Sequence, residues 1–238
     1  MQQRSGGSAC RRIDGPGDRS GLRAFRAVPL PLLLVPFLPL AAQDASAALS
    51  RAERAYASAT SLQAEFGQTI SNPMLGDPEV SSGTLYLVKP DRFAMRFADP
   101  AGDRIVADGT WLWAYTPSSV RDQVIRQSPP TSGTATPNLF AQFVERPLER
   151  YEVSYAGRDT VAGDPVELVT LVPRQRNLGF RRATVAVSER TGWIRRVALI
   201  EDSGQRRTLV LTALKPNADI PAAELTFTPP RGVKIVTP

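Results

Sequence analysis

Short apolar runs separated by turn residues fill the sequence from Leu62 to the C-terminus. Turn-forming pairs such as Asp108-Gly109, Thr191-Gly192 and Ser203-Gly204 stand between them. Runs of strand length with a turn every ~8–12 residues are typical of an antiparallel sandwich or barrel. The predicted strands are residues 62–69, 83–89, 92–98, 104–107, 111–115, 120–127, 151–155, 166–172, 180–187, 193–200, 206–214 and 225–227.

Two segments have helical spacing instead. Apolar residues recur three or four positions apart at Leu49, Ala52, Ala55, Tyr56 and Ala59, which predicts one helix before the first strand. Residues 138–144 are the only plausible second helix. We therefore predict a single mainly β domain with few helices.

Several predicted strands are apolar on both faces. In residues 111–115, the sequence WLWAY, two tryptophans and a tyrosine share one face, while Leu112 and Ala114 share the other. A sheet with one wet face alternates apolar and polar residues. Both faces of these strands must therefore be covered, by helices on one side and a curled sheet on the other. The interior is then either a solid core or a ligand cavity.

The N-terminal segment has the pattern of an export signal. Arg23 and Arg26 precede an apolar run over residues 27–40, and Ala45, Ser46 and Ala47 form an A-x-A cleavage signal. The run is too short for a membrane span, which needs ~20 apolar residues. We predict a signal peptide with an N-terminal extension over residues 1–47 and one domain over residues 48–238. An uncleaved anchor is the alternative.

Composition argues for binding over catalysis. The chain has no histidine, and its one cysteine, Cys10, lies in the predicted leader. The commonest general base and the commonest zinc ligand are thus missing, and no nucleophile elbow or phosphate-binding loop occurs. The net charge of +6 is interspersed along the chain, so no nucleic-acid partner is indicated. We expect no catalytic residues, no metal and no cofactor.

An ordered set of motifs resembles the outer-membrane lipoprotein carrier family, LolA. No single motif is specific, but together they extend over about residues 48–236. The motifs are Phe66-x-Gln68, SGTLYLVKP at 82–90, RFAMRF at 92–97, Pro100, DGTWLWAYTP at 108–117, and FTPPRGV at 227–233, which resembles the closing strand of that family.

This resemblance implies an open, unclosed antiparallel β half-barrel of about eleven strands, covered by short α-helices that act as a lid. It also implies a periplasmic chaperone, acting as a monomer, that binds the acyl chains of lipoproteins in an apolar cavity. Such a carrier receives them from an inner-membrane ABC transporter and delivers them to an outer-membrane lipoprotein acceptor. No chemical bond changes in that transfer, so neither a catalytic residue nor a cofactor is needed.

Site residues follow from the resemblance. Lys89 precedes the proline where the family usually has an arginine thought to hold the lid by hydrogen bonds to helix residues. With Lys89, the expected lid residues are Leu139, Phe140 and Phe143. The expected lipid-binding cavity residues are Phe66, Leu85, Leu87, Phe93, Met95, Phe97 and Trp113.

The alternatives are a lipid-sensing or partner-binding envelope regulator domain of the same fold, an unrecognised secreted hydrolase with a two-carboxylate site, and a structural envelope protein with a solid interior. The lipidated acceptor of the same fold carries a cysteine directly after its signal sequence, and this chain has none there.

Overall fold

A computed structural model describes residues 40–74, 76–128, 140–175 and 178–238. The chain divides into two units, Met1–Phe37 and Leu38–Pro238, and all described residues belong to the second.

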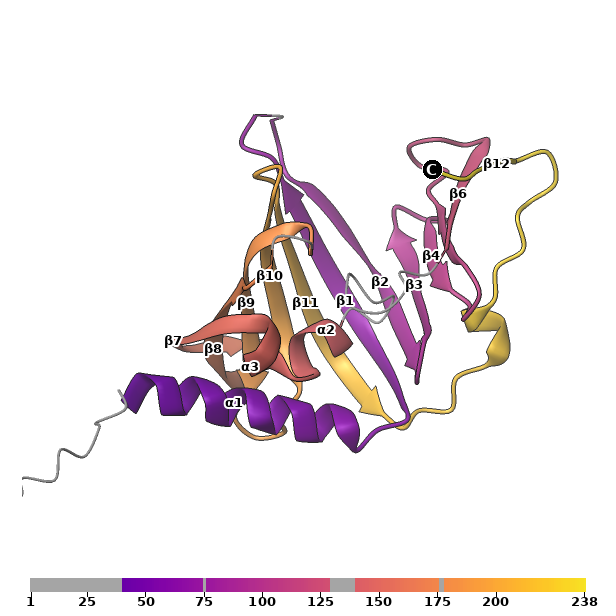
Figure 1. Ribbon diagram of the computed structural model, residues 1–238. Coiled ribbons are helices and arrows are strands. Elements are labelled where there is room, and N and C mark those ends of the chain that lie inside the picture. Colours follow the sequence, from indigo (N-terminus) through magenta and orange to yellow (C-terminus); the bar gives the residue numbers. More distant parts are fainter. Residues whose placement is uncertain (1–39, 75, 129–139, 176–177) are drawn as a thin grey trace, which may run out of the picture. The chain divides into compact units, whose positions relative to one another are not determined.

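One twelve-stranded sheet forms the centre of the described unit (Figure 1), in the order β12-β6-β5-β4-β3-β2-β1-β11-β10-β9-β8-β7. Every neighbouring pair is antiparallel except β12 with β6, which is parallel. Among the described strands, no pairing joins the edges β12 and β7, so the sheet is unclosed. The strands are β1 Ser61–Ser71, β2 Glu79–Val88, β3 Arg92–Asp99, β4 Arg104–Ala107, β5 Leu112–Tyr115, β6 Gln123–Gln127, β7 Tyr151–Val161, β8 Asp164–Pro173, β9 Phe180–Ser188, β10 Ile194–Glu201, β11 Arg206–Pro216 and β12 Lys234–Val236.

The predicted fold class is confirmed, with twelve strands instead of about eleven. The period of two read from β1 is also correct, because Leu62, Ala64, Phe66 and Gln68 are buried while Glu65 and its alternating neighbours are exposed or half-buried. Strand alternation is a local property of the chain, so it is readable without tertiary information.

The helices differ more from expectation. Helix α1, Leu40–Ala57, has 18 residues and starts well before the predicted helix. Helix α2, Ala141–Val144, is shorter than the predicted 138–144, and the unpredicted α3, Pro147–Arg150, follows it. Helix α1 crosses the predicted leader boundary, and Ala45 is fully buried. Cleavage after Ala47 stays a prediction.

The C-terminal segment corrects another expectation. Residues 225–227 are not a strand: Ala222–Leu225 forms the 3-10 helix η1, and the chain then continues without regular structure to β12. A pattern of three residues is too short to separate a strand from a packed loop.

Candidate functional site

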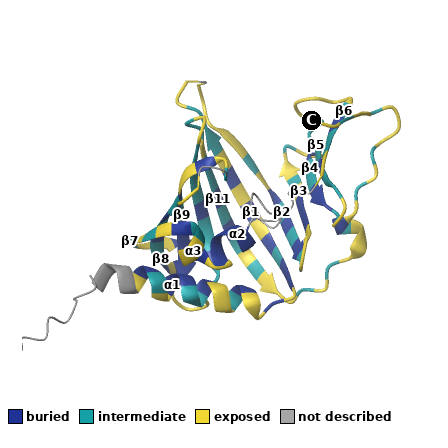
Figure 2. Cartoon of the chain, viewed as in Figure 1, coloured by how far each residue is buried: buried dark blue, intermediate teal, exposed yellow. Residues whose placement is uncertain are grey.

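The sheet has an inner face, turned toward α1 and α2, and an opposite outer face (Figure 1). Figure 2 shows buried positions recurring along the central strands. The inner face carries the main apolar cluster, in which the Phe66 and Phe97 rings meet edge to face, 5.1 Å apart. Register aligns these side chains across strands, since Leu87 pairs with both Leu62 and Phe93.

The structure brings six of the seven predicted cavity residues together in this cluster: Phe66, Leu85, Leu87, Phe93, Met95 and Phe97. All are buried except Phe97, which is half-buried. In this structure they pack against one another and the helices. Their binding role stays a prediction.

Trp113 is the exception. Its register partner is Val106, which pairs in turn with Ala94, and both belong to the smaller cluster on the outer face. Phe227 packs against the Trp113 ring at 5.7 Å and against Tyr115 at 5.8 Å. The structure therefore does not bring Trp113 together with the other six predicted cavity residues. Strand alternation predicts that Trp113 and Leu112 lie on opposite faces of the sheet, but it does not indicate which of the two faces is the inner one.

The C-terminal segment covers this outer face of β3–β5. Leu225 is 2% exposed beside Ala94 and Val106, and Glu224 accepts a hydrogen bond from Arg96 at 2.9 Å. The prediction that both faces of the WLWAY strand are covered is thus correct for the outer face; on the inner face Leu112 packs against the main apolar cluster and is half-buried. The cover on the outer side is the C-terminal segment, which the sequence did not indicate.

Helix α1 covers part of the inner face with an apolar stripe. Ala45, Ala48, Leu49, Ala52 and Tyr56 are buried at three- and four-residue spacing, as one face of a helix requires. Alanines allow close approach: a Cβ on Gly192, in the β9–β10 turn, would lie 2.7 Å from the Arg51 carbonyl oxygen of α1.

Two of the three predicted lid residues pack beside α1. Phe140, directly before α2, is 4% exposed, and Phe143 is fully buried against the rings of Tyr151 and Phe180. Leu139 lies outside the described residues. The Tyr151 hydroxyl donates a hydrogen bond to the Gln142 carbonyl at 2.9 Å, which ties α2 to β7, and burial raises the pKa of Tyr151.

Lys89 lies at the end of α1, where the resemblance predicted a latch. Its Nζ donates hydrogen bonds to the carbonyl oxygens of Tyr56 and Ala57, and sits 4.1 Å from the centroid of the Tyr56 ring. A cation is also favoured near the carboxyl end of a helix. Partial burial lowers the pKa of Lys89, and the charge of Glu145 acts in the opposite direction.

A second charged contact on α1 was not predicted. Arg51 forms an ion pair with Glu167 of β8, whose side chain is 12% exposed. Glu167 lies on the same face of β8 as Val169 and Leu171 of the inner cluster, so it points toward α1. Pairing of residues so far apart in sequence carries no local signal.

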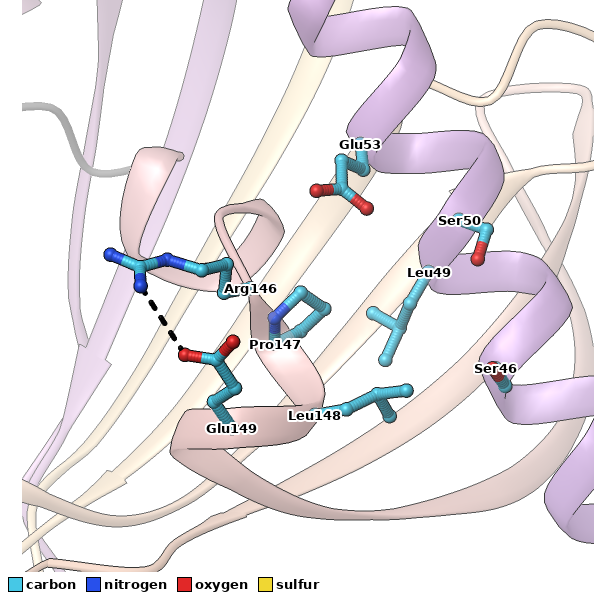
Figure 3. Close-up of a pocket in the computed structure, with 8 residues that line it drawn as sticks. All are labelled: Ser46, Leu49, Ser50, Glu53, Arg146, Pro147, Leu148 and Glu149. Carbon is cyan, nitrogen blue, oxygen red and sulfur yellow. Dashed lines mark hydrogen bonds and ion pairs between the residues drawn. The ribbon is translucent and has the colours of Figure 1, made fainter.

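A cavity of about 230 Å³ lies between α1 and the segment containing α3 (Figure 3). Leu49 and Leu148 lie near each other in the figure, and Arg146 pairs with Glu149. The lining residues are Ser46, Leu49, Ser50, Glu53, Arg146, Pro147, Leu148 and Glu149. Ser46 belongs to the predicted leader, so cleavage after Ala47 would remove part of this wall.

Among the described residues, no group of three or more histidine, cysteine, aspartate or glutamate side chains is placed to hold a metal ion. No helix in the described ranges combines the length and apolar character that crossing a membrane requires.

An unclosed antiparallel sheet with an apolar inner face and covering helices defines a half-barrel binding protein. The chain belongs to the LolA family: the family model described as outer membrane lipoprotein carrier protein LolA matches residues 57–228. The prediction of this family from the motif order is confirmed.

Curated relatives agree. The outer-membrane lipoprotein carrier protein of Chromobacterium violaceum is 28% identical over 83% of this chain and 91% of its own. The protein of the same name from Alkalilimnicola ehrlichii is 28% identical over 90% of this chain and 94% of its own. The crystal structure of an uncharacterized conserved protein from Thermus thermophilus matches with a TM-score of 0.50 at 11% identity, covering 81% and 98% of the two chains. That likeness concerns the fold alone.

Proposed function

We propose that this protein is a periplasmic carrier that binds the acyl chains of lipoproteins on its inner face and moves them from the inner to the outer membrane. The observation that carries the proposal is the continuous apolar inner face beneath α1 and α2, in a chain of the LolA family. An inner-membrane ABC transporter is the proposed donor and an outer-membrane lipoprotein acceptor the proposed recipient. The carrier acts as a monomer.

The energetics of acyl transfer fit such a face. Each buried CH₂ contributes ~0.8 kcal/mol, so an acylated protein in water requires an apolar site. Beneath α1 and α2, only about 10 Å³ remains in the pocket lined by Ala52, Tyr56, Leu62, Phe140, Val144, Trp193 and Ile194. Acyl chains would therefore enter this pocket only when α1 and α2 move away from the sheet.

Lys89 is the proposed latch for this movement. Its hydrogen bonds join the end of β2 to the last residues of α1. Removal of cargo needs the same opening, so the latch would set how readily the carrier loads and unloads. Transfer between two binding sites breaks no covalent bond, and we propose no catalytic role for any residue.

Native mass spectrometry tests the proposal. The exported protein is purified without detergent, with and without co-expression of a triacylated lipoprotein. We expect a one-to-one complex that keeps its cargo. Absence of the complex, together with no binding of a hydrocarbon fluorescent probe, would reject the carrier function.

Two photo-cross-linking variants of the protein locate the binding site for the lipoprotein. Benzoylphenylalanine replaces Phe97 on the inner face in one variant and Tyr115 on the outer face in the other; both positions are half-buried. Irradiation should link the lipoprotein to position 97 and not to position 115. Equal yields at the two positions would contradict binding at the inner face.

A further inference from the structure

The apolar inner face ends in a group of polar side chains that the proposed function does not yet use. Along β1, Leu62, Ala64 and Phe66 belong to the inner cluster, and Gln68 is the next residue on the same face. Gln68 pairs with Leu209 of β11, and Arg207 lies two residues before Leu209 on that face. At ~3.4 Å per residue, Gln68 lies about 20 Å along β1 from Leu62.

Hydrogen bonds join these side chains into one network across four strands. The Arg207 Nε donates to Glu201 Oε1 at 3.0 Å, and its Nη1 donates to Gln68 Oε1 at 3.5 Å. Gln68 Nε2 donates in turn to Ser81 Oγ at 3.3 Å. We call Gln68, Ser81, Glu201 and Arg207 the rim cluster.

The side chains of the rim cluster are partly or largely buried. Gln68 is only 9% exposed, and the side chains of Arg207 and Glu201 are 37% and 22% exposed. A polar group placed beside an apolar face needs hydrogen-bond partners, or it costs stability. The network supplies those partners and also leaves Arg207 accessible to a ligand.

The chemistry of the rim cluster favours neutral acceptors. A guanidinium has five N–H donors, and the two bonds above account for two of them. Glu201 balances the charge of Arg207, so the pair offers little net attraction to a further carboxylate or a phosphate. Ester and amide carbonyl oxygens accept such hydrogen bonds without adding charge.

The position of the rim cluster on the inner face favours binding of the polar end of a lipid. β1 starts beside the carboxyl end of α1 and runs away from that helix (Figure 1). Acyl chains lying along the inner face would have their tails near α1 and Lys89, and their polar ends near the rim cluster.

We propose that the rim cluster binds the ester and amide carbonyl oxygens that join the acyl chains to the lipoprotein, with Arg207 as the principal donor. This proposal rests on the proposed carrier function and assigns a polar subsite to the same inner face. It makes the carrier selective for acylated cargo over plain hydrocarbon.

Two probes separate the subsite from the apolar face. One is a synthetic triacylated lipopeptide, and the other is diphenylhexatriene, a hydrocarbon without hydrogen-bonding groups. Arg207→Met should weaken lipopeptide binding about tenfold, equivalent to ~1.4 kcal/mol, with diphenylhexatriene binding unchanged. Arg206→Met is the matched control, because Arg206 is the adjacent, exposed residue of β11 and points to the other face. Its binding of both probes should equal that of the unmodified protein.

Arg207→Met leaves Glu201 without its partner, so Arg207→Met/Glu201→Met is made as well; it should show the same selective loss. A third comparison uses the unmodified protein, with an ether-linked analogue of the lipopeptide that lacks the ester carbonyls. The analogue should bind several-fold more weakly than the ester form, and the difference should disappear in either folded variant.

The outcomes are distinct. Equal binding of the ester and ether forms by the unmodified protein overturns the rim-cluster proposal and leaves the carrier function intact. So does unchanged lipopeptide binding by a folded Arg207 variant. If the unmodified protein binds neither the lipopeptide nor diphenylhexatriene, the carrier function itself fails, and the subsite with it.

Discussion

Asp108 organises the turn between β4 and β5. Its Oδ1 accepts hydrogen bonds from the backbone N–H groups of Thr110 and Trp111, and its Oδ2 accepts one from Trp113 Nε1 at 2.8 Å. Burial alone would raise the pKa of Asp108, but these hydrogen bonds to the carboxylate outweigh it and the pKa is lowered. The next residue, Gly109, has φ +94°, which suits glycine.

We expect Asp108→Asn to lower the free energy of unfolding by about 1–2 kcal/mol at pH 7, since the amide NH₂ cannot accept from Trp113. Because the pKa of Asp108 is lower in the folded than in the unfolded state, its carboxylate stabilises the fold fully at pH values above the unfolded-state pKa. This stabilisation is lost as the pH falls through the folded-state pKa. The difference between the two proteins should therefore shrink below about pH 4. Urea unfolding at several pH values measures it. Asp219→Asn, an exposed aspartate after β11, is the control, and a pH-independent difference would contradict the argument.

Lys89 gives a second prediction for a single residue. Lys89→Leu removes the donor to the Tyr56 and Ala57 carbonyls, so the end of α1 should open more readily by about 1–2 kcal/mol. Hydrogen exchange in the last turn of α1 should accelerate and bound cargo should dissociate faster. Lys89→Arg should restore both, because it keeps a cationic donor. Lys215→Leu, at an exposed position of β11, controls for loss of a lysine. Unchanged exchange and cargo retention would remove Lys89 from the mechanism.

At the scale of elements, α1 is held to the sheet by the Arg51–Glu167 ion pair, by the Lys89 contacts and by close packing on the β9–β10 turn. The turn places Gly192 at φ +76°, and a Cβ added there would point at the backbone of α1. Gly163, in the β7–β8 turn, has φ +77° but open space around it. Comparing the same substitution at the two glycines therefore separates the cost of backbone strain from the cost of steric overlap with α1.

We expect Gly163→Ala to cost about 1–2 kcal/mol from the left-handed conformation alone. Gly192→Ala should cost a further 1–3 kcal/mol or so, because its methyl group would push α1 off the sheet. Denaturant unfolding of both variants measures the difference. Equal losses would mean that α1 does not rest on this turn.

At the scale of the whole molecule, the sheet separates two apolar faces with different covers. Helices α1 and α2 cover part of the inner face, and the C-terminal segment covers the outer face of β3–β5. The first cover is proposed to open for cargo. The second is held by buried Leu225 and by the Arg96–Glu224 pair, and we expect it to contribute to stability.

Leu225→Ala should therefore lower the free energy of unfolding by about 2–4 kcal/mol, while the folded variant keeps its affinity for diphenylhexatriene. Leu148→Ala, at a position 50% exposed, should change stability by less than about 0.5 kcal/mol. Unfolding curves and probe titrations on the same samples measure both quantities. Loss of probe binding by folded Leu225→Ala would show that the two faces are coupled.

The sequence by itself determined the properties that depend on local order. Alternation along the strands and turns such as Asp108-Gly109 predicted an antiparallel sandwich or barrel. The order of motifs resembled the LolA family and so implied the unclosed half-barrel, and six of the seven cavity residues lie together. These features could be read because strand period and turn chemistry act over a few residues.

Only the tertiary structure decided which face is inner and what covers each side. Trp113 and Leu112 lie on opposite faces by alternation, but their environments depend on where α1 and the C-terminal segment pack. The Arg51–Glu167 pair and the rim cluster join residues more than a hundred positions apart, as with Gln68 and Arg207. Such contacts arise from sheet register and curvature, which no short stretch of sequence specifies.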